Sequence, residues 1–344
     1  MKKRILKILC VFSALFVLFF SGCSKGGKTA VTVNEAEVSN GVYAYYIDKV
    51  LSYPDEYAVN EEGSEGVAER DAVTETALGL CRNFVAADML MSDLGLSVSQ
   101  QLKSEVAENT ENIWSLFGEY YKSIDVSKSD ITKINTFEAQ KMQLLDYYYG
   151  KGGKNEVSDD DLKQKFVEMY IGFKCFEGTF TKVNVKGETV EMTEKEKENT
   201  ISEFRKMAQR VDGGESIDDV YADYCSGQGL VATSELEVIV MKENDPMYAD
   251  DFFSKVSTIS HGRAAPVTSG SSIYVVERCT IASSDEDAFE KYRTEVLEEM
   301  KMSAIEKKIA KKVQYLNSVL QEDISVKIYN TVSAGHEEKK AQNT

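Results

Sequence analysis

The sequence predicts an α+β protein: a helical N-terminal lobe, completed by a long C-terminal helix, with an inserted domain that mixes strands and helices. Three observations support this class. Apolar residues recur at helical spacing in the first 150 residues and again from residue 287 to residue 320. Between these regions, short β-branched runs alternate with helical patterns. A glycine-rich stretch, Gly150 to Lys154, separates the first helical region from the mixed one.

The first residues have the pattern of an export signal. Four basic residues precede an uncharged apolar run, Ile8 to Phe20, whose 13 residues are fewer than the roughly 20 that span a bilayer. Ser21 and Gly22 directly precede Cys23, which resembles a bacterial lipobox with Phe20 in the place of the usual Leu. We therefore expect residues 1–22 to be a lipoprotein signal peptide and Cys23 to be acylated, so that the chain is anchored on the extracytoplasmic side of the cell membrane. An ordinary signal peptide cut elsewhere and a signal anchor are the alternatives.

The composition excludes several classes of protein. With 42% hydrophobic and 10% aromatic residues, the 344-residue chain is able to form extensive cores, so global disorder is excluded. Its formal net charge is −17, and loss of the four basic residues of the signal makes it −21. Such a surface repels phosphates, so we expect neither nucleic acid nor, apart from the anchor, anionic lipid headgroups as partners.

The cysteines and histidines favour no catalytic or metal chemistry. Cys81, Cys175, Cys225 and Cys279 show no CxxC pattern and no metal-ligand spacing, so no metal or cofactor is expected. One or two disulfides and buried free thiols are both compatible with these four residues. The chain has only two histidines and no Gly-x-Ser-x-Gly motif, which argues against a hydrolase.

The helical lobe follows a short Gly/Lys/Ser spacer that we expect to be flexible. A strand, a turn and a helix that starts at Ser39 or Asn40 and stops before Pro54 come first. Apolar spacing then predicts a long helix from Ala72 to Leu94 after a loop at Asn60–Gly66, a helix from Ser99 and another from Ser129 to Tyr149. The triplet Tyr147–Tyr149 would suit a binding platform, but packing is the more typical role.

The second domain begins at a helix start signal. Ser158 and Asp161 form a capping box pattern, and Val157 and Leu162 have the spacing of a hydrophobic staple. The elements expected after it are helices at 159–170, 193–211 and 216–224, a strand within 173–185, and strands at 238–241 and 272–278.

The C-terminal region returns to helical spacing from Asp287 to Leu320. A helix of that length needs a partner for its apolar stripe, and the first helical region is the available one. We therefore expect the two ends of the chain to pack together, with the second domain inserted between them. Ile324, Val326 and Ile328 alternate with polar residues and predict a last strand, followed by a disordered tail.

Two segments resemble parvulin-type peptidyl-prolyl isomerases. Gly214 to Ser226 is similar to that family's Gly-Glu-x-Phe-x-x-x-Ala-x-x-Tyr-Ser helix, and Phe253 to Arg278 is similar to its closing segment. Val31 to Asn34, followed by an aromatic helix, resembles the opening of membrane-anchored foldase lipoproteins of Gram-positive bacteria and of periplasmic chaperones with a helical N-terminal lobe. The resemblance implies a small antiparallel sheet flanked by helices in the insert. The expected organisation is a signal peptide at 1–22, the lipidated Cys23 and spacer at 23–30, a chaperone lobe at 31–150, a parvulin-like domain at 156–282, a helix and strand at 285–330 packing on the lobe, and a disordered tail at 331–344.

The insert departs from the family at its histidines. Cys175 lies in the strand that usually supplies the first histidine, and Ser272 stands at the position of the second. Pro246 matches a family proline, which places Tyr248 at a pocket aromatic. The resemblance thus implies a peptide-binding role for Tyr248, Phe253, Ser272 and Cys175, with no catalytic residue.

The predicted function is that of a membrane-anchored foldase or chaperone for unfolded or partly folded exported polypeptides. Its parvulin-like domain is expected to be weak or inactive as an isomerase. The alternatives are an active peptidyl-prolyl cis-trans isomerase and a non-enzymatic binding or structural envelope lipoprotein. Candidate client contacts in the helical lobe, each individually more typical of a core, are Met89, Met91, Trp114, Phe117 and Tyr147–Tyr149.

Overall fold

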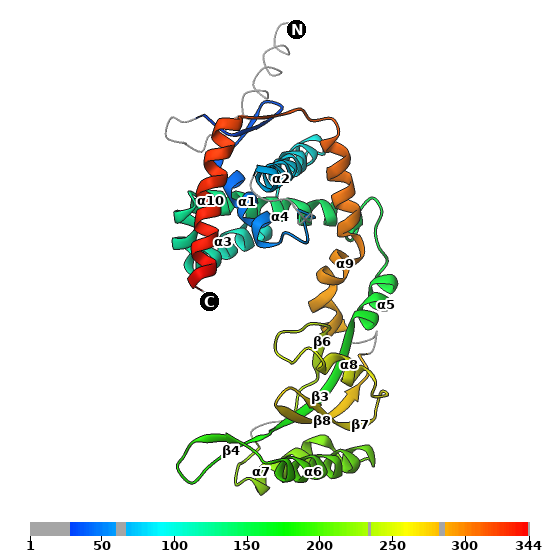
Figure 1. The fold of residues 1–344 in the computed structure, drawn as a ribbon. Coiled ribbons are helices and arrows are strands. Elements are labelled where there is room, and N and C mark those ends of the chain that lie inside the picture. Colours follow the sequence, from blue (N-terminus) through cyan, green and yellow to red (C-terminus); the bar gives the residue numbers. More distant parts are fainter. Residues whose placement is uncertain (1–27, 60–66, 233–234, 282–285, 343–344) are drawn as a thin grey trace. The chain divides into compact units, whose positions relative to one another are not determined.

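The computed structural model describes residues 28–59, 67–232, 235–281 and 286–342. The predicted signal peptide, Cys23, most of the spacer and the predicted loop at 60–66 lie outside these residues. The α+β class is confirmed, with helices and small antiparallel sheets (Figure 1). The chain divides into two compact units, unit 1 with residues 1–156 and 300–344 and unit 2 with residues 157–299. Among the described residues, no helix combines the length and apolar character needed to cross a bilayer.

Unit 1 is mainly helical. Its elements are β1 (Val31–Val33), β2 (Ala36–Val38), α1 (Asn40–Ser52), α2 (Val67–Asp93), α3 (Gln100–Ser123), α4 (Lys128–Tyr149), the second half of α9 (Glu286–Val313), β9 (Ser318–Leu320) and α10 (Glu322–Gln342). Helix α1 is buried on most sides, and its Tyr43 hydroxyl lies 2.8 Å from the Ser325 hydroxyl of α10. Strand β1 pairs antiparallel with both β2 and β9, so residues near the two ends of the chain share one sheet.

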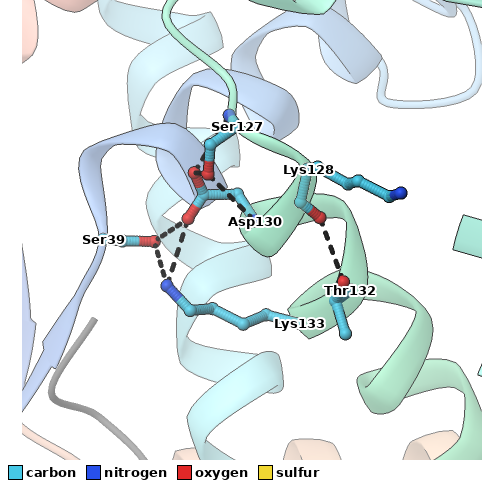
Figure 2. A network of polar contacts seen from close by, with 6 residues as sticks. All are labelled: Ser39, Ser127, Lys128, Asp130, Thr132 and Lys133. Carbon is cyan, nitrogen blue, oxygen red and sulfur yellow. Dashed lines mark hydrogen bonds and ion pairs between the residues drawn. The ribbon is translucent and has the colours of Figure 1, made fainter. Parts of the chain in front are cut away.

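A buried carboxylate joins the start of α4 to the start of α1 (Figure 2). Asp130 accepts hydrogen bonds from the hydroxyls of Ser127 and Ser39 and from Lys133 Nζ, the last at 3.1 Å. With Ser127 it forms a reciprocal capping box. An ideal Cβ on Gly41 would lie 2.2 Å from Asp130 Oδ2, so the two helix starts approach as closely as glycine permits.

The predicted C-terminal strand and disordered tail are wrong. Residues 324–328 belong to α10, which continues to Gln342. The alternating apolar residues misled the prediction because the buried positions of α10, Ser325, Val332 and His336, follow helical spacing instead. The long helix ends at Val313 rather than at Leu320. The strand lies at Ser318–Leu320, before the predicted position.

Unit 2 is a four-stranded sheet between two helical layers. Its elements are α5 (Asp159–Met169), β3 (Tyr170–Thr179), β4 (Thr181–Val183), β5 (Thr189–Glu191), α6 (Glu194–Asp212), α7 (Ile217–Gly227), β6 (Ile239–Lys242), α8 (Phe252–Ser257), β7 (Ala264–Ser269), β8 (Ser272–Cys279) and the first half of α9. The strand order is β6-β3-β8-β7, and every neighbouring pair is antiparallel.

The two faces of this sheet carry separate cores. Phe176, Ile273 and Val275 pack with Phe204 of α6 and Val220 of α7 on one face. The other face packs against α8, through residues that include Phe173, Val276, Phe252 and Val256. The period-two alternation of β3 and β8 thus divides the side chains of each strand between the two layers.

Helix α9 crosses from unit 2 into unit 1 between Glu299 and Met300. Its first half belongs to unit 2 because Phe289 and Tyr292 pack against Phe166, at ring centroid distances of 6.0 and 5.9 Å. Arg293 also pairs with Asp159, with 2.5 Å between nitrogen and oxygen. The sequence placed this crossing earlier, between residues 282 and 285.

Candidate functional site

The four predicted peptide-binding residues lie on the α8 side of the unit 2 sheet. Cys175 of β3 stands opposite Val276 of β8, and Ser272 stands opposite Thr179. Phe253 of α8 is half-buried against the core on this side, as is Tyr248 in the segment before α8. We call this surface the aromatic face; it consists of Cys175, Glu177, Tyr248, Phe253, Ser272 and Tyr274, with the buried Phe252 stacked against Tyr248 and the exposed Met247 next to Tyr248 in the chain.

Stacked rings form the centre of the aromatic face. Tyr248 lies parallel to Phe252, with ring centroids 4.3 Å apart and planes 11° apart. Tyr274 meets Phe252 edge-on at 4.8 Å, and Phe173 meets Tyr248 edge-on at 5.8 Å. Such offset and edge contacts are the favoured geometries of aromatic pairs, so Tyr248 is held in place although it is half-exposed.

The polar groups of the aromatic face are neutral or already paired. Burial raises the pKa of the Cys175 thiol to about 11, against the opposing effect of a hydrogen bond from Tyr248. Burial also raises the pKa of Tyr248 and of Tyr274. Glu177 accepts hydrogen bonds from the Ser272 hydroxyl and, at 3.3 Å, from the Tyr274 hydroxyl. At neutral pH the Cys175 thiol and the two phenols of the face are therefore uncharged.

The two histidines lie elsewhere. His261 is exposed in the turn between α8 and β7. His336 is buried in unit 1, where its Nδ1 lies 3.4 Å from Asp48 Oδ1. All four cysteines outside the signal and Cys23 are free thiols. The described residues contain no group of three or more His, Cys, Asp or Glu that could hold a metal ion.

A groove adjoins the aromatic face at the edge of the sheet. It has a volume of about 610 Å³ and lies between α8 and the edge strand β7, with Ser254, Lys255, Ile259, Pro266 and Val267 among its lining residues. Two outward backbone groups of β7 are occupied, because Asp212 accepts from the Ala264 amide at 3.2 Å and Lys255 Nζ donates to the Thr268 carbonyl at 2.6 Å. Pro266 has no amide hydrogen.

This edge is therefore protected against the addition of another strand. We therefore expect a polypeptide in the groove to bind mainly through its side chains rather than by extending the sheet.

Sequence reasoning missed Tyr274, Glu177 and Met247. Ser272 is only 9% exposed, and its hydroxyl donates a hydrogen bond to Glu177. Tyr274, two residues later on the same side of β8, contributes an aromatic ring to the centre of the face. Strand alternation from Ser272 to Arg278 would have indicated Tyr274, since residues 272, 274 and 276 share one side. Met247 is 84% exposed beside Tyr248 and offers an adaptable apolar contact.

The fold and this face define a two-unit α+β protein whose inserted unit presents a half-exposed aromatic surface beside a neutral thiol. The chain is similar to the solved structure of foldase protein PrsA from Lactococcus lactis, with 12% identity, 89% of this chain and 99% of that chain covered, and a TM-score of 0.37. It is similar to foldase protein PrsA from Streptococcus pneumoniae, with 12% identity, coverages of 76% and 87%, and a TM-score of 0.37.

A further likeness is to a solved structure from Campylobacter jejuni, described for two related SurA-like chaperones, PEB4 and Cj1289. The identity is 11%, the coverages are 86% of this chain and 99% of that chain, and the TM-score is 0.28. No family model and no curated protein matches the sequence.

Proposed function

We propose that the chain is a membrane-anchored extracytoplasmic foldase or chaperone that holds unfolded exported polypeptides, with weak or no isomerase activity in its parvulin-like unit. The observation that carries this proposal is the aromatic face. Tyr248, Phe253 and Tyr274 are half-exposed, Met247 is 84% exposed, and a groove continues the surface along β7. Hydrophobic and aromatic side chains with few polar groups are typical of sites that bind apolar segments.

The chemistry of the same face supports the proposal that isomerase activity is weak or absent. Rotation about a prolyl bond has a barrier near 18–20 kcal/mol, and catalysis requires polar groups that stabilise the twisted amide. The hydroxyl of Tyr274 donates to Glu177 and that of Tyr248 to Cys175, so both donors are already engaged. Neither histidine lies on this face.

The anchoring part of the proposal rests on the sequence pattern around Cys23. Labelling cells with a radioactive fatty acid is expected to label the chain and not its Cys23→Ser variant. Equal labelling of both chains, or of neither, would contradict the lipid anchor.

Polypeptide holding is tested by suppression of aggregation when a chemically denatured client is diluted. The chain without its signal is expected to suppress aggregation, and the double variant Met247→Ser, Phe253→Ser to lose most of that effect. Val185→Ser is the matched control, because Val185 is equally apolar and fully exposed, on the β4–β5 hairpin. Equal loss in both variants would refute a specific role of the aromatic face.

The isomerase part is tested by refolding of a protein whose slow phase is limited by prolyl isomerisation, which takes tens of seconds at 25 °C. We expect the rate of the slow phase to stay nearly unchanged when the chain is added. Acceleration equal to that by an intact parvulin would refute this part and favour the active isomerase.

A further inference from the structure

A cluster of lysines and tyrosines in unit 1 has no role in the proposed client site. Tyr147, Tyr148 and Tyr149 end α4, Lys154 follows in the connection to α5, and Lys301 and Lys308 lie on α9. Lys154 Nζ is 4.9 Å from the Tyr147 ring centroid, Lys308 Nζ is 4.1 Å from that of Tyr148, and Lys301 Nζ is 5.7 Å from that of Tyr149. We call these six residues the lysine–tyrosine surface.

The three ammonium groups have no carboxylate partner in the described part of the chain. Some other lysines on the same two long helices do, since Lys312 pairs with Asp93 at 2.5 Å and Lys141 with Glu138 at 2.5 Å. A chain with net charge −17 has carboxylates in excess. These three cations lie over three consecutive rings and have no carboxylate partner among the described residues, so they are available to an anion from outside the chain.

The helix macrodipole does not explain these lysines. It favours cations in the last turn of a helix, where α9 has Lys311 and Lys312. Lys301 and Lys308 lie before that turn, and Glu306 is the only acidic residue between Met300 and Val313. The second half of α9 is thus a basic segment in an acidic protein.

Tyrosines beside lysines suit the surface of an anionic membrane. Tyrosine rings are enriched at the headgroup level of bilayers, where their apolar part and their hydroxyl meet different environments. Each lysine near an anionic leaflet contributes attraction that falls off within a Debye length. All three tyrosines are half-exposed, Lys154 is exposed, and Lys301 and Lys308 are half-exposed.

The chain's own anchor would keep this surface within reach of lipid. If Cys23 is acylated, as the proposed function requires, seven residues, and thus eight Cα-to-Cα steps, separate it from Val31 at the start of β1. An extended segment of that length spans at most about 28 Å. Unit 1 therefore stays close enough to the bilayer for one of its sides to meet the headgroups.

The net charge of the protein does not oppose such contact. At physiological ionic strength the Debye length is about 8 Å, so a membrane interacts mainly with the charges that face it. The expectation that anionic headgroups are excluded as partners rests on the net charge of the whole chain, which is an average over its surface. The lysine–tyrosine surface is a local exception to that average.

We propose that the lysine–tyrosine surface docks unit 1 on the anionic lipid headgroups of the membrane that holds the anchor. This rests on the proposed extracytoplasmic anchoring and adds a second, electrostatic contact to it. Docking by one side restricts how unit 1 rotates about its tether.

The experiment measures binding of the chain from residue 23 onward, carrying Cys23→Ser so that no lipid contributes, to vesicles of phosphatidylcholine with about 30 mol% phosphatidylglycerol. The triple variant Lys154→Gln, Lys301→Gln, Lys308→Gln is expected to bind roughly 100-fold more weakly. The triple Lys→Arg variant retains the charges and is expected to bind like the parent. Binding of the parent is expected to weaken strongly at about 1 M salt, where the Debye length is near 3 Å.

The matched control is Lys339→Gln. Lys339 of α10 also belongs to unit 1 and lies over an aromatic ring, with Nζ 4.2 Å from the Tyr120 centroid, but it is outside the surface. We expect this variant to bind vesicles with less than a two-fold change. Thermal unfolding of each variant shows whether the substitutions disturb the fold, and the Lys→Arg variant preserves the test if the Gln variant unfolds.

Three results would overturn the proposal: no binding to the anionic vesicles, equal binding to vesicles of phosphatidylcholine alone, or equal weakening by Lys339→Gln. Binding to soluble polyphosphate without binding to vesicles would also overturn it, because the ligand would then be a free polyanion. None of these results bears on suppression of client aggregation, so failure of the docking proposal is distinguishable from failure of the proposed function.

Discussion

At the scale of single residues, environment decides which chemistry Cys175 is capable of. Burial raises the pKa of its thiol to about 11, so almost no thiolate is present at neutral pH. A residue that stands in the strand where the resembled family has a histidine thus offers neither a base nor a nucleophile here.

This predicts slow alkylation of Cys175 in the folded protein. At pH 7.5 its thiolate fraction is roughly 300-fold lower than that of a thiol with the ordinary pKa of about 8.5. The rate of iodoacetamide labelling, followed by mass spectrometry, is therefore expected to rise with pH up to about 11 and to increase at neutral pH when the chain is unfolded in urea. Rapid labelling of the native chain at pH 7.5 would contradict the account.

Asp130 shows the opposite shift. Burial alone would raise its pKa, but the hydrogen bonds from Ser127, Ser39 and Lys133 outweigh burial and hold the pKa below its ordinary value. A carboxyl with a lowered folded-state pKa contributes stability that is fully present above its unfolded pKa. That contribution is lost as the pH falls through the folded-state value.

We expect Asp130→Asn to destabilise unit 1 by about 1–3 kcal/mol at pH 7, because three donors lose a charged acceptor. The difference between the variant and the parent should shrink below about pH 4, where the carboxyl is protonated in the unfolded chain. Urea unfolding at several pH values measures this. A difference independent of pH would show that the network does not depend on the charge.

At the scale of elements, local signals predicted helix starts better than strand partners. Ser99 and Ser158 accept hydrogen bonds from backbone amides at the starts of α3 and α5, as their positions before helical patterns indicate. The pairing of β1 with β9 was not predictable in this way, because it joins residues nearly 300 positions apart. The alternation at 324–328 was too short to distinguish a strand from a helix.

The packing of α10 is testable, because glycine-to-alanine substitutions in α10 and α2 are expected to change stability in opposite directions. An ideal Cβ on Gly335 of α10 would lie 2.5 Å from Ile124 Cγ2, whereas one on Gly79 of α2 would meet nothing within 4 Å. Gly79→Ala is therefore expected to stabilise the protein by about 0.5–1 kcal/mol through helix propensity. Gly335→Ala should destabilise it by about 1–3 kcal/mol through overpacking.

Thermal unfolding of the two variants measures both effects. Stabilisation by both substitutions would mean that Gly335 of α10 does not pack against Ser123 and Ile124 at the end of α3. The predicted disordered tail would then be the better description.

At the scale of the whole molecule, the sequence indicated that unit 2 has a peptide-binding surface, but not the full set of residues that form it. The aromatic face is assembled from β3, the segment before α8, α8 itself and β8, which come from separate parts of the chain. Resemblance selected Tyr248, Phe253, Ser272 and Cys175, all of which lie on this side of the sheet. It did not select Tyr274, because the resemblance indicates only the position of the family histidine, Ser272, whereas Tyr274 follows from alternation along β8.

The central claim is that unfolded chains bind to the aromatic face rather than to the opposite side of the unit 2 sheet. A photo-reactive benzophenone side chain placed at Phe253 on α8, or at the exposed Glu203 on α6, measures this directly in the presence of an unfolded client. We expect strong crosslinking from position 253 and little from position 203. Equal crosslinking from both positions, or crosslinking mainly from position 203, would contradict the account.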